Sequence, residues 1–100
     1  MLVRGTTPTI RFTFSKIDVA TIAVAYMTIE QKSIVIEKDL SEATVGEKYI
    51  EWKLTQEDTV RLNDKVVCRV QCRYKTSDML AYASKIYEVK PYDILKDGVI

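Results

Sequence analysis

The stretch that decides the fold is VVCRVQCRYK, residues 66–75. Apolar or weakly polar side chains alternate in it with charged and amide side chains, so that Val66, Cys68, Val70, Cys72 and Tyr74 are interleaved with Arg69, Gln71, Arg73 and Lys75. Successive side chains of a β-strand point to opposite faces of its sheet. The stretch therefore predicts a strand with one buried and one solvent-facing side, which is typical of an antiparallel sheet that covers a core.

The same two-residue period occurs in three other segments, residues 9–14, 34–37 and 49–54. Residues 22–29 are apolar on both faces, and residues 80–89 mix aromatic, aliphatic and polar side chains, so we predict a strand in each. Turns are predicted at residues 31–33, 44–48, 62–65 and 76–78. Helix has a single predicted place, because the sequence TQED at residues 55–58 matches a capping box.

These strands cannot form one flat sheet without exposing a large apolar face, so we expect two packed sheets. The prediction is an all-β fold, a small immunoglobulin-like antiparallel β-sandwich of about six to eight strands with at most one short helical turn. In an antibody domain the conserved tryptophan lies between two cysteines in the sequence. This order is absent here, because Trp52 precedes both Cys68 and Cys72. We divide the chain into an N-terminal arm (residues 1–8), a β-sandwich domain (residues 9–90) and a C-terminal docking tail (residues 91–100).

The composition argues against catalysis and against cofactor binding. The chain has no histidine, so it lacks the commonest general base and metal ligand. No two carboxylates can be assigned to a catalytic pair, and the three glycines form no phosphate-binding loop. We therefore predict a protein that is not an enzyme and has no catalytic residues, cofactor, metal or small-molecule substrate. No apolar run is long enough to span a bilayer, so we expect no membrane association.

The charge balance argues against nucleic acid as a partner, because 15 basic and 14 acidic residues leave a net charge of only +1. One alternative starts from a basic stripe on the strand described first, made of Arg69, Arg73 and Lys75. With Tyr82 or Tyr87 on a neighbouring strand, this stripe would resemble a sheet that binds single-stranded nucleic acid. The competing interpretation is a solvated face whose charges are balanced across the ladder by Glu51 or Glu88.

The two cysteines are predicted to be structural. Cys68 and Cys72 point to the same face of one strand, about 13 Å apart at about 3.3 Å per residue. This separation is too large for a disulfide, and a zinc site would need further cysteines or histidines that the chain lacks. We expect both thiols to be reduced, buried and slow to react.

Three segments are predicted to contact other chains. The motif RGTTPT at residues 4–9 favours an extended arm that leads into an edge strand, or else a strand entry that packs on its own domain. The second face of residues 22–29 is either covered within the chain or meets another chain, and the apolar tail likewise packs internally or on a partner. The predicted partner-binding residues are Leu2, Val3, Arg4, Thr6, Thr7, Ala23, Ala25, Met27, Ile94, Leu95, Val99 and Ile100.

Three short motifs carry a resemblance to a known group of proteins: RGTTPT, LTQEDT at residues 54–59 and the ending ILKDGVI. Together they resemble small proteins that bacteriophages and prophages of Firmicutes encode near tail and baseplate genes. In pattern alone, the chain is loosely similar to the immunoglobulin-like N-terminal domain of phage baseplate upper proteins.

The resemblance implies a non-enzymatic structural or adaptor component of a phage or phage-tail-like particle, associated with the tail or baseplate. Such a protein would be synthesised in the bacterial cytoplasm and would bind other virion or tail proteins or further copies of itself. The alternatives are a prophage-encoded protein that interacts with the host, and a domain that binds single-stranded nucleic acid.

Overall fold

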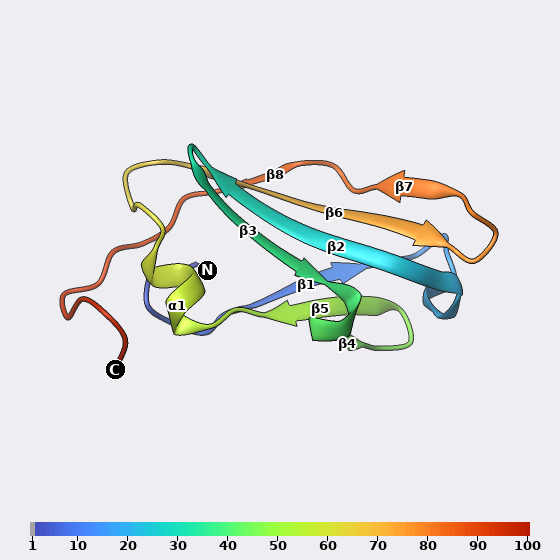
Figure 1. Cartoon of the computed structure of the whole chain (residues 1–100), viewed down its shortest axis with the longest axis horizontal. Helices are drawn as coiled ribbons and strands as arrows, with labels where there is room; N and C mark the ends of the chain where they lie inside the picture. The colour runs from blue at the N-terminus through green and yellow to red at the C-terminus, as the bar shows by residue number, and fades with distance from the viewer. Residues whose placement is uncertain (1) are drawn as a thin grey trace.

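The computed structural model describes residues 2–100 and consists of two antiparallel sheets packed face to face (Figure 1). Met1, the first residue of the predicted arm, lies outside the described residues. The smaller sheet contains β1 (Thr9–Thr13), β5 (Tyr49–Lys53) and β4 (Thr44–Val45), in that order. The larger sheet contains β3 (Ile34–Asp39), β2 (Ile22–Gln31) and β6 (Cys68–Thr76), and then β7 (Ala81–Ala83) and β8 (Tyr87–Val89), which both pair with β6. The predicted small antiparallel β-sandwich is confirmed.

The predicted helical turn is also present. Helix α1 (Gln56–Val60) begins after Thr55, whose side chain accepts a hydrogen bond from the Asp58 amide while the Asp58 carboxylate accepts one from the Thr55 amide. Asp58 also forms a 2.9 Å ion pair with Lys38 of β3, which ties the helix to the larger sheet. Burial alone would raise the pKa of Asp58, but the hydrogen bonds from Thr55 and Lys38 outweigh it and lower the pKa below its ordinary value.

Two 3₁₀ turns, η1 (Val19–Thr21) and η2 (Leu40–Glu42), were not expected from the sequence. Each follows an aspartate whose side chain accepts a hydrogen bond from a backbone amide of the turn, namely Asp18 before η1 and Asp39 before η2. Aspartate is a preferred residue for this capping role, so both turns have a local cause. Such single turns lack the periodicity by which helices are predicted.

The core lies between the sheets and is built from the apolar faces of β5, β2 and β6. Trp52 and Ile50 from β5 are buried against residues of the larger sheet such as Met27 and Ile29. The indole Nε1 of Trp52 donates a 2.8 Å hydrogen bond to the carbonyl oxygen of Asp39. Trp52 therefore fills the core and also joins the smaller sheet to the end of β3.

The assignment of Ala25 and Met27 to an outer, partner-binding face is wrong. Both side chains are fully buried in the core, and Val24 and Tyr26 are the exposed large apolar residues of this strand. The pairing of β2 with β6 has an irregularity between Ile22 and Val24, where Ala23, which is also exposed, has no partner. A bulge of this kind moves all later residues to the opposite face, and a strand that is apolar on both sides shows no sign of it in its sequence.

Cys68 and Cys72 are free, fully buried thiols of the inner face of β6, as predicted. Burial raises the pKa of Cys72 to about 11 and also raises that of Cys68. Because the thiolate is the reactive form, we expect a disulfide reagent at pH 8 to label both cysteines at least about a hundredfold more slowly in the folded protein than in denaturant. Rapid labelling of the folded protein would show that this face of β6 lies outside the core.

Candidate functional site

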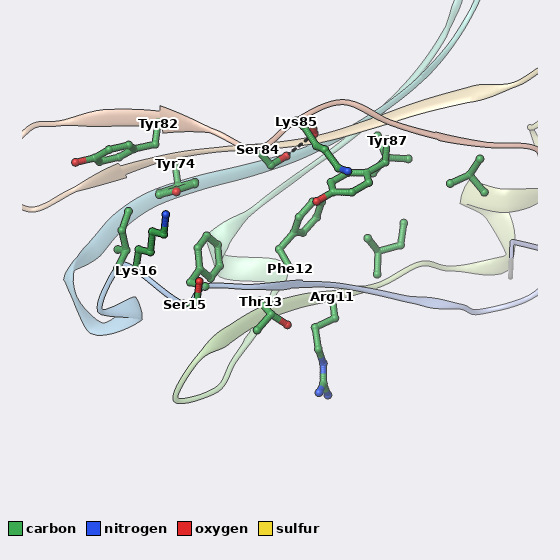
Figure 2. A pocket seen from close by; sticks show the side chains of 15 residues that line it. Arg11, Phe12, Thr13, Ser15, Lys16, Tyr74, Tyr82, Ser84, Lys85 and Tyr87 are labelled. Carbon is green, nitrogen blue, oxygen red and sulfur yellow. Dashed lines mark hydrogen bonds between the residues drawn. The ribbon is translucent and has the colours of Figure 1, made fainter.

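A groove with a volume of about 920 Å³ runs between the two sheets along one side of the sandwich (Figure 2). One wall is β1 together with the loop that follows it, and the other is formed by β6, β7 and β8. The groove lining comprises Ile10, Arg11, Phe12, Thr13, Phe14, Ser15, Lys16, Ile17, Val70, Tyr74, Tyr82, Ser84, Lys85, Tyr87 and Val89. Much of this surface is apolar because β1 and the larger sheet turn their core-facing side chains toward it.

Aromatic rings contact one another across the groove. Phe12 meets Tyr87 edge to face with ring centroids 6.3 Å apart, and Phe14 meets Tyr74 in the same way at 5.0 Å. Tyr74 in turn stacks on Tyr82, its cross-strand neighbour in β7, at 5.4 Å. Burial raises the pKa of Tyr74, which favours its neutral phenol. The rings hold the two walls together while leaving Tyr82 and Tyr87 partly exposed.

The charged residues that line the groove are all basic. Arg11 forms a 2.9 Å ion pair with Glu51 of β5, and its guanidinium carbon lies 3.9 Å from the centre of the Tyr49 ring. The amine of Lys85 lies 5.0 Å from the centre of the Tyr87 ring, and Lys16 lies at the other wall. No carboxylate belongs to the lining. An anionic group in the groove would therefore meet cations and no competing acid.

A second unusual arrangement joins the arm to the tail. Val3 forms a parallel bridge with Tyr92, and the Arg4 amide donates a 2.9 Å hydrogen bond to the Tyr92 carbonyl. Leu2 is buried in the core cluster. Gly5 has a positive φ of 70°, a backbone conformation that favours glycine, and the nearest atom to a Cβ placed there would be Cδ1 of the Ile94 side chain at 2.7 Å.

The Arg4 side chain is the centre of this junction. It donates hydrogen bonds to the carbonyl oxygens of Val60, the last residue of α1, at 2.9 Å and of Leu62, just after the helix, at 2.6 Å. It also forms ion pairs with Asp93 at 2.7 Å and Asp97 at 3.3 Å. The side chain of Arg4 thus links the N-terminal arm, the end of α1 and the tail.

The structure places the predicted partner-binding residues in different environments. Leu2, Val3 and Arg4 pack on the chain itself, which matches the second of the two possibilities given for the arm. Thr6, Thr7 and Ala23 are exposed. Ala25 and Met27 lie in the core. In the tail, Ile94 is half-buried, and Leu95, Val99 and Ile100 are exposed together with Tyr92. The tail backbone is therefore held by the arm, and most of its apolar side chains face solvent.

The basic stripe and the tyrosines do not form one surface. Tyr82 and Tyr87 lie opposite Tyr74 and Val70 of β6, on the side of the sheet that faces the groove. Arg69 and Arg73 point to the other side, since side chains alternate along β6. Arg69 lies opposite Glu88 and forms a 3.3 Å ion pair with Glu30, so its charge is balanced on the outer face.

The groove was missed in the sequence analysis. Phe12 and Phe14 were recognised as the inner side chains of one strand, and Tyr82 and Tyr87 as part of another mixed segment. About 60 to 75 residues separate the two walls along the chain. The pairing of β7 and β8 with β6 builds one wall, and the packing of the two sheets brings this wall against β1. The alternation of Phe12 and Phe14 was the available signal, and it does not identify the neighbouring strands; Tyr82 and Tyr87 are five positions apart and share a face only through the bulge between them.

Within residues 2–100, no group of three or more histidine, cysteine, aspartate or glutamate side chains is arranged to hold a metal ion. The described part of the chain contains no helix long and apolar enough to cross a membrane. No protein-family model, curated protein or solved structure matches this chain.

Proposed function

We propose that the chain is a non-enzymatic adaptor that acts through protein–protein contacts, and that its working surface is the groove between β1 and β7–β8. The observation that carries the proposal is the groove itself, which is apolar, aromatic and basic, and is open along a side of the sandwich. Partly exposed tyrosines are enriched at the centres of protein interfaces, and charged side chains such as those of Lys16 and Lys85 suit the polar rim around them. The exposed apolar residues of the tail provide a second surface of the same kind.

The partners that we propose are other proteins of a bacteriophage tail or of a tail-like particle. This part of the proposal depends on the motifs RGTTPT, LTQEDT and ILKDGVI, which resemble those of proteins encoded near tail and baseplate genes. A prophage-encoded protein that binds a host protein would use the same groove. The location of the chain in infected or induced cells separates these two possibilities.

The experiment is sedimentation of particles from a lysate of the bacterium that encodes the chain. We expect the chain to sediment with assembled particles. Tyr82→Ala should reduce the bound fraction, because it removes a partly exposed ring of the groove. A loss of about 1–2 kcal/mol of binding free energy corresponds to roughly tenfold weaker binding. Val35→Ala is the matched control, since Val35 is exposed on β3, away from the groove. A chain that stays entirely at the top of the gradient would contradict the proposal.

A further inference from the structure

The two sheets differ in width on the side where the groove lies. The larger sheet is four strands wide, because β7 and β8 share one edge of β6, whereas the smaller sheet has three strands and ends at β1. The groove lies beside β1 and under β7 and β8, which is the position that a fourth strand of the smaller sheet would occupy. The rings of Tyr82 and Tyr87, on the inner face of the larger sheet, therefore meet β1 on the side toward the core and have no strand of the smaller sheet on the other side (Figure 2).

The outer edge of β1 has free main-chain groups. The Phe14 amide bonds to the Lys48 carbonyl, and the Leu54 amide to the Pro8 carbonyl. In an antiparallel pair, every second residue of a strand forms its main-chain hydrogen bonds with the partner strand. In β1 these are the even-numbered residues, which bond to β5. The N–H and C=O groups of Arg11 and Thr13 therefore point away from β5. Neither amide has a hydrogen-bond partner within residues 2–100.

The other three sheet edges are each protected against strand addition. β4 has only two residues, and β3 ends in three charged residues. Tyr74 of β6 lies opposite Tyr82 of β7, and Val70 of β6 lies opposite Tyr87 of β8. The two residues of β6 are four positions apart and their partners are five apart, so the β7–β8 edge contains a one-residue bulge. Short strands, charges and bulges are the usual protections of edge strands.

The charge on β1 does not protect its edge in this way. The guanidinium of Arg11 is directed back over β5, where it contacts Glu51 and Tyr49. Thr9 and Thr13, the other outward residues of β1, are small and uncharged. The edge of β1 is thus regular, unpaired and bordered by an apolar groove, which together favour addition of a strand from another protein.

We propose that β1 binds an extended segment of a partner protein as a fourth strand of the smaller sheet. Alternate side chains of this segment are apolar and enter the groove against Phe12, Phe14 and Tyr87. At least one acidic side chain faces Lys16 or Lys85, because the groove lining contains cations and no carboxylate. The inference rests on the proposed function, since it names how the adaptor holds its partner.

Two other occupants fit the surface less well. Nucleic acid would stack on open aromatic faces, whereas Tyr74, Tyr82 and Phe14 already pack on one another, and a nucleic acid would leave the free amides of β1 unused. A second copy that added its own β1 would bring together two groove linings that each contain Lys16 and Lys85 and no carboxylate. Both occupants are outcomes of the experiment below.

The experiment is selection of binders from a random dodecapeptide library displayed on yeast, followed by measurement of Kd for synthetic versions of the enriched peptides. We expect peptides with alternating apolar residues and aspartate or glutamate. Thr13→Pro should weaken binding about tenfold or more, because it removes an amide on the free edge without removing a bond to β5, whereas Thr13→Ala should change Kd less than about twofold. Proline is tolerated where the edge N–H faces solvent, and circular dichroism checks that the variant is folded.

A second measurement uses the unmodified protein. N-methylation of the peptide amides that face β1 should abolish binding, and N-methylation of the alternate set should preserve it. The proposal is overturned if no peptide is enriched, if neither Thr13→Pro nor N-methylation affects binding, or if a twelve-nucleotide oligothymidine displaces the peptides. It is also overturned if the free chain forms dimers that Thr13→Pro abolishes, because a second copy would then be the occupant.

Sedimentation with particles distinguishes failure of this inference from failure of the proposed function. If the unmodified chain and Thr13→Pro both sediment with particles, the chain is a particle component but β1 is not its attachment edge. If the unmodified chain does not sediment with particles, the proposed function fails whatever the peptides show.

Discussion

Replacing Trp52 by alanine is expected to lower the free energy of unfolding by about 3–5 kcal/mol, which is a large share of the about 5–15 kcal/mol typical of a domain. The side chain is almost fully buried between the sheets, so its removal leaves a cavity at the centre of the core. It also leaves the Asp39 carbonyl oxygen without the indole donor. We expect the melting temperature to fall by at least about 12 °C.

Urea unfolding followed by circular dichroism measures this effect, since the substitution removes the single tryptophan that fluorescence would report. Trp52→Phe separates packing from hydrogen bonding: it keeps an aromatic ring and should cost about 1–2 kcal/mol. The exposed Val35 provides the control, because Val35→Ala should stay within about 0.5 kcal/mol. A loss below about 1 kcal/mol for Trp52→Ala would contradict the arrangement of the core.

Replacing Arg4 by alanine is expected to have the second largest effect, a loss of about 2 kcal/mol. The reason is that Arg4 donates to two backbone carbonyls at the C-terminal end of α1, and its side chain is largely buried. Its ion pairs with Asp93 and Asp97 involve more exposed carboxylates, so they add little to stability. They do hold the tail, and Arg4→Ala should therefore release residues 93–100 to proteolysis.

Thermal unfolding together with limited proteolysis and mass spectrometry tests both parts of this prediction. Arg61→Ala is the matched control, because Arg61 is an exposed arginine at the C-cap of α1 with no ion pair among the described residues. Arg4→Lys should have an intermediate effect, since one ammonium group cannot reproduce the several directed bonds of a guanidinium. Unchanged stability and an intact tail in Arg4→Ala would show that the junction of arm and tail does not form.

The strands whose buried face was predicted correctly are those with one apolar and one polar side, whereas residues 22–29 were predicted as a strand with its faces reversed. In β6 the alternation of Cys68, Val70 and Cys72 with polar residues matches the observed burial, and the capping box at Thr55 marks the start of α1. Both signals are local, because they depend on residues within a few positions of one another. Such a local pattern predicts the buried face correctly whenever the strand or helix keeps its regular geometry.

The features that the sequence did not reveal depend on contacts between distant segments or on irregular geometry. The bulge at Ala23 determines which side chains of β2 face the core. The groove depends on the contact between Tyr87 and Phe12, which belong to different sheets. The role of Arg4 was likewise not visible, because its partners Val60 and Asp93 lie 56 and 89 residues away. An apolar strand without alternation is compatible with both registers, so its sequence alone cannot choose between them.

Amide hydrogen exchange of β1, measured by NMR, tests most directly the claim that this strand is an open binding edge. In the free protein we expect the amides of Arg11 and Thr13 to exchange at least about a hundredfold faster than those of Phe12 and Phe14, which are bonded to β5. An enriched peptide should slow exchange at Arg11 and Thr13 and leave Phe12 and Phe14 unchanged. Equal protection of all four amides in the free protein would show that the edge of β1 is already covered and would contradict the account.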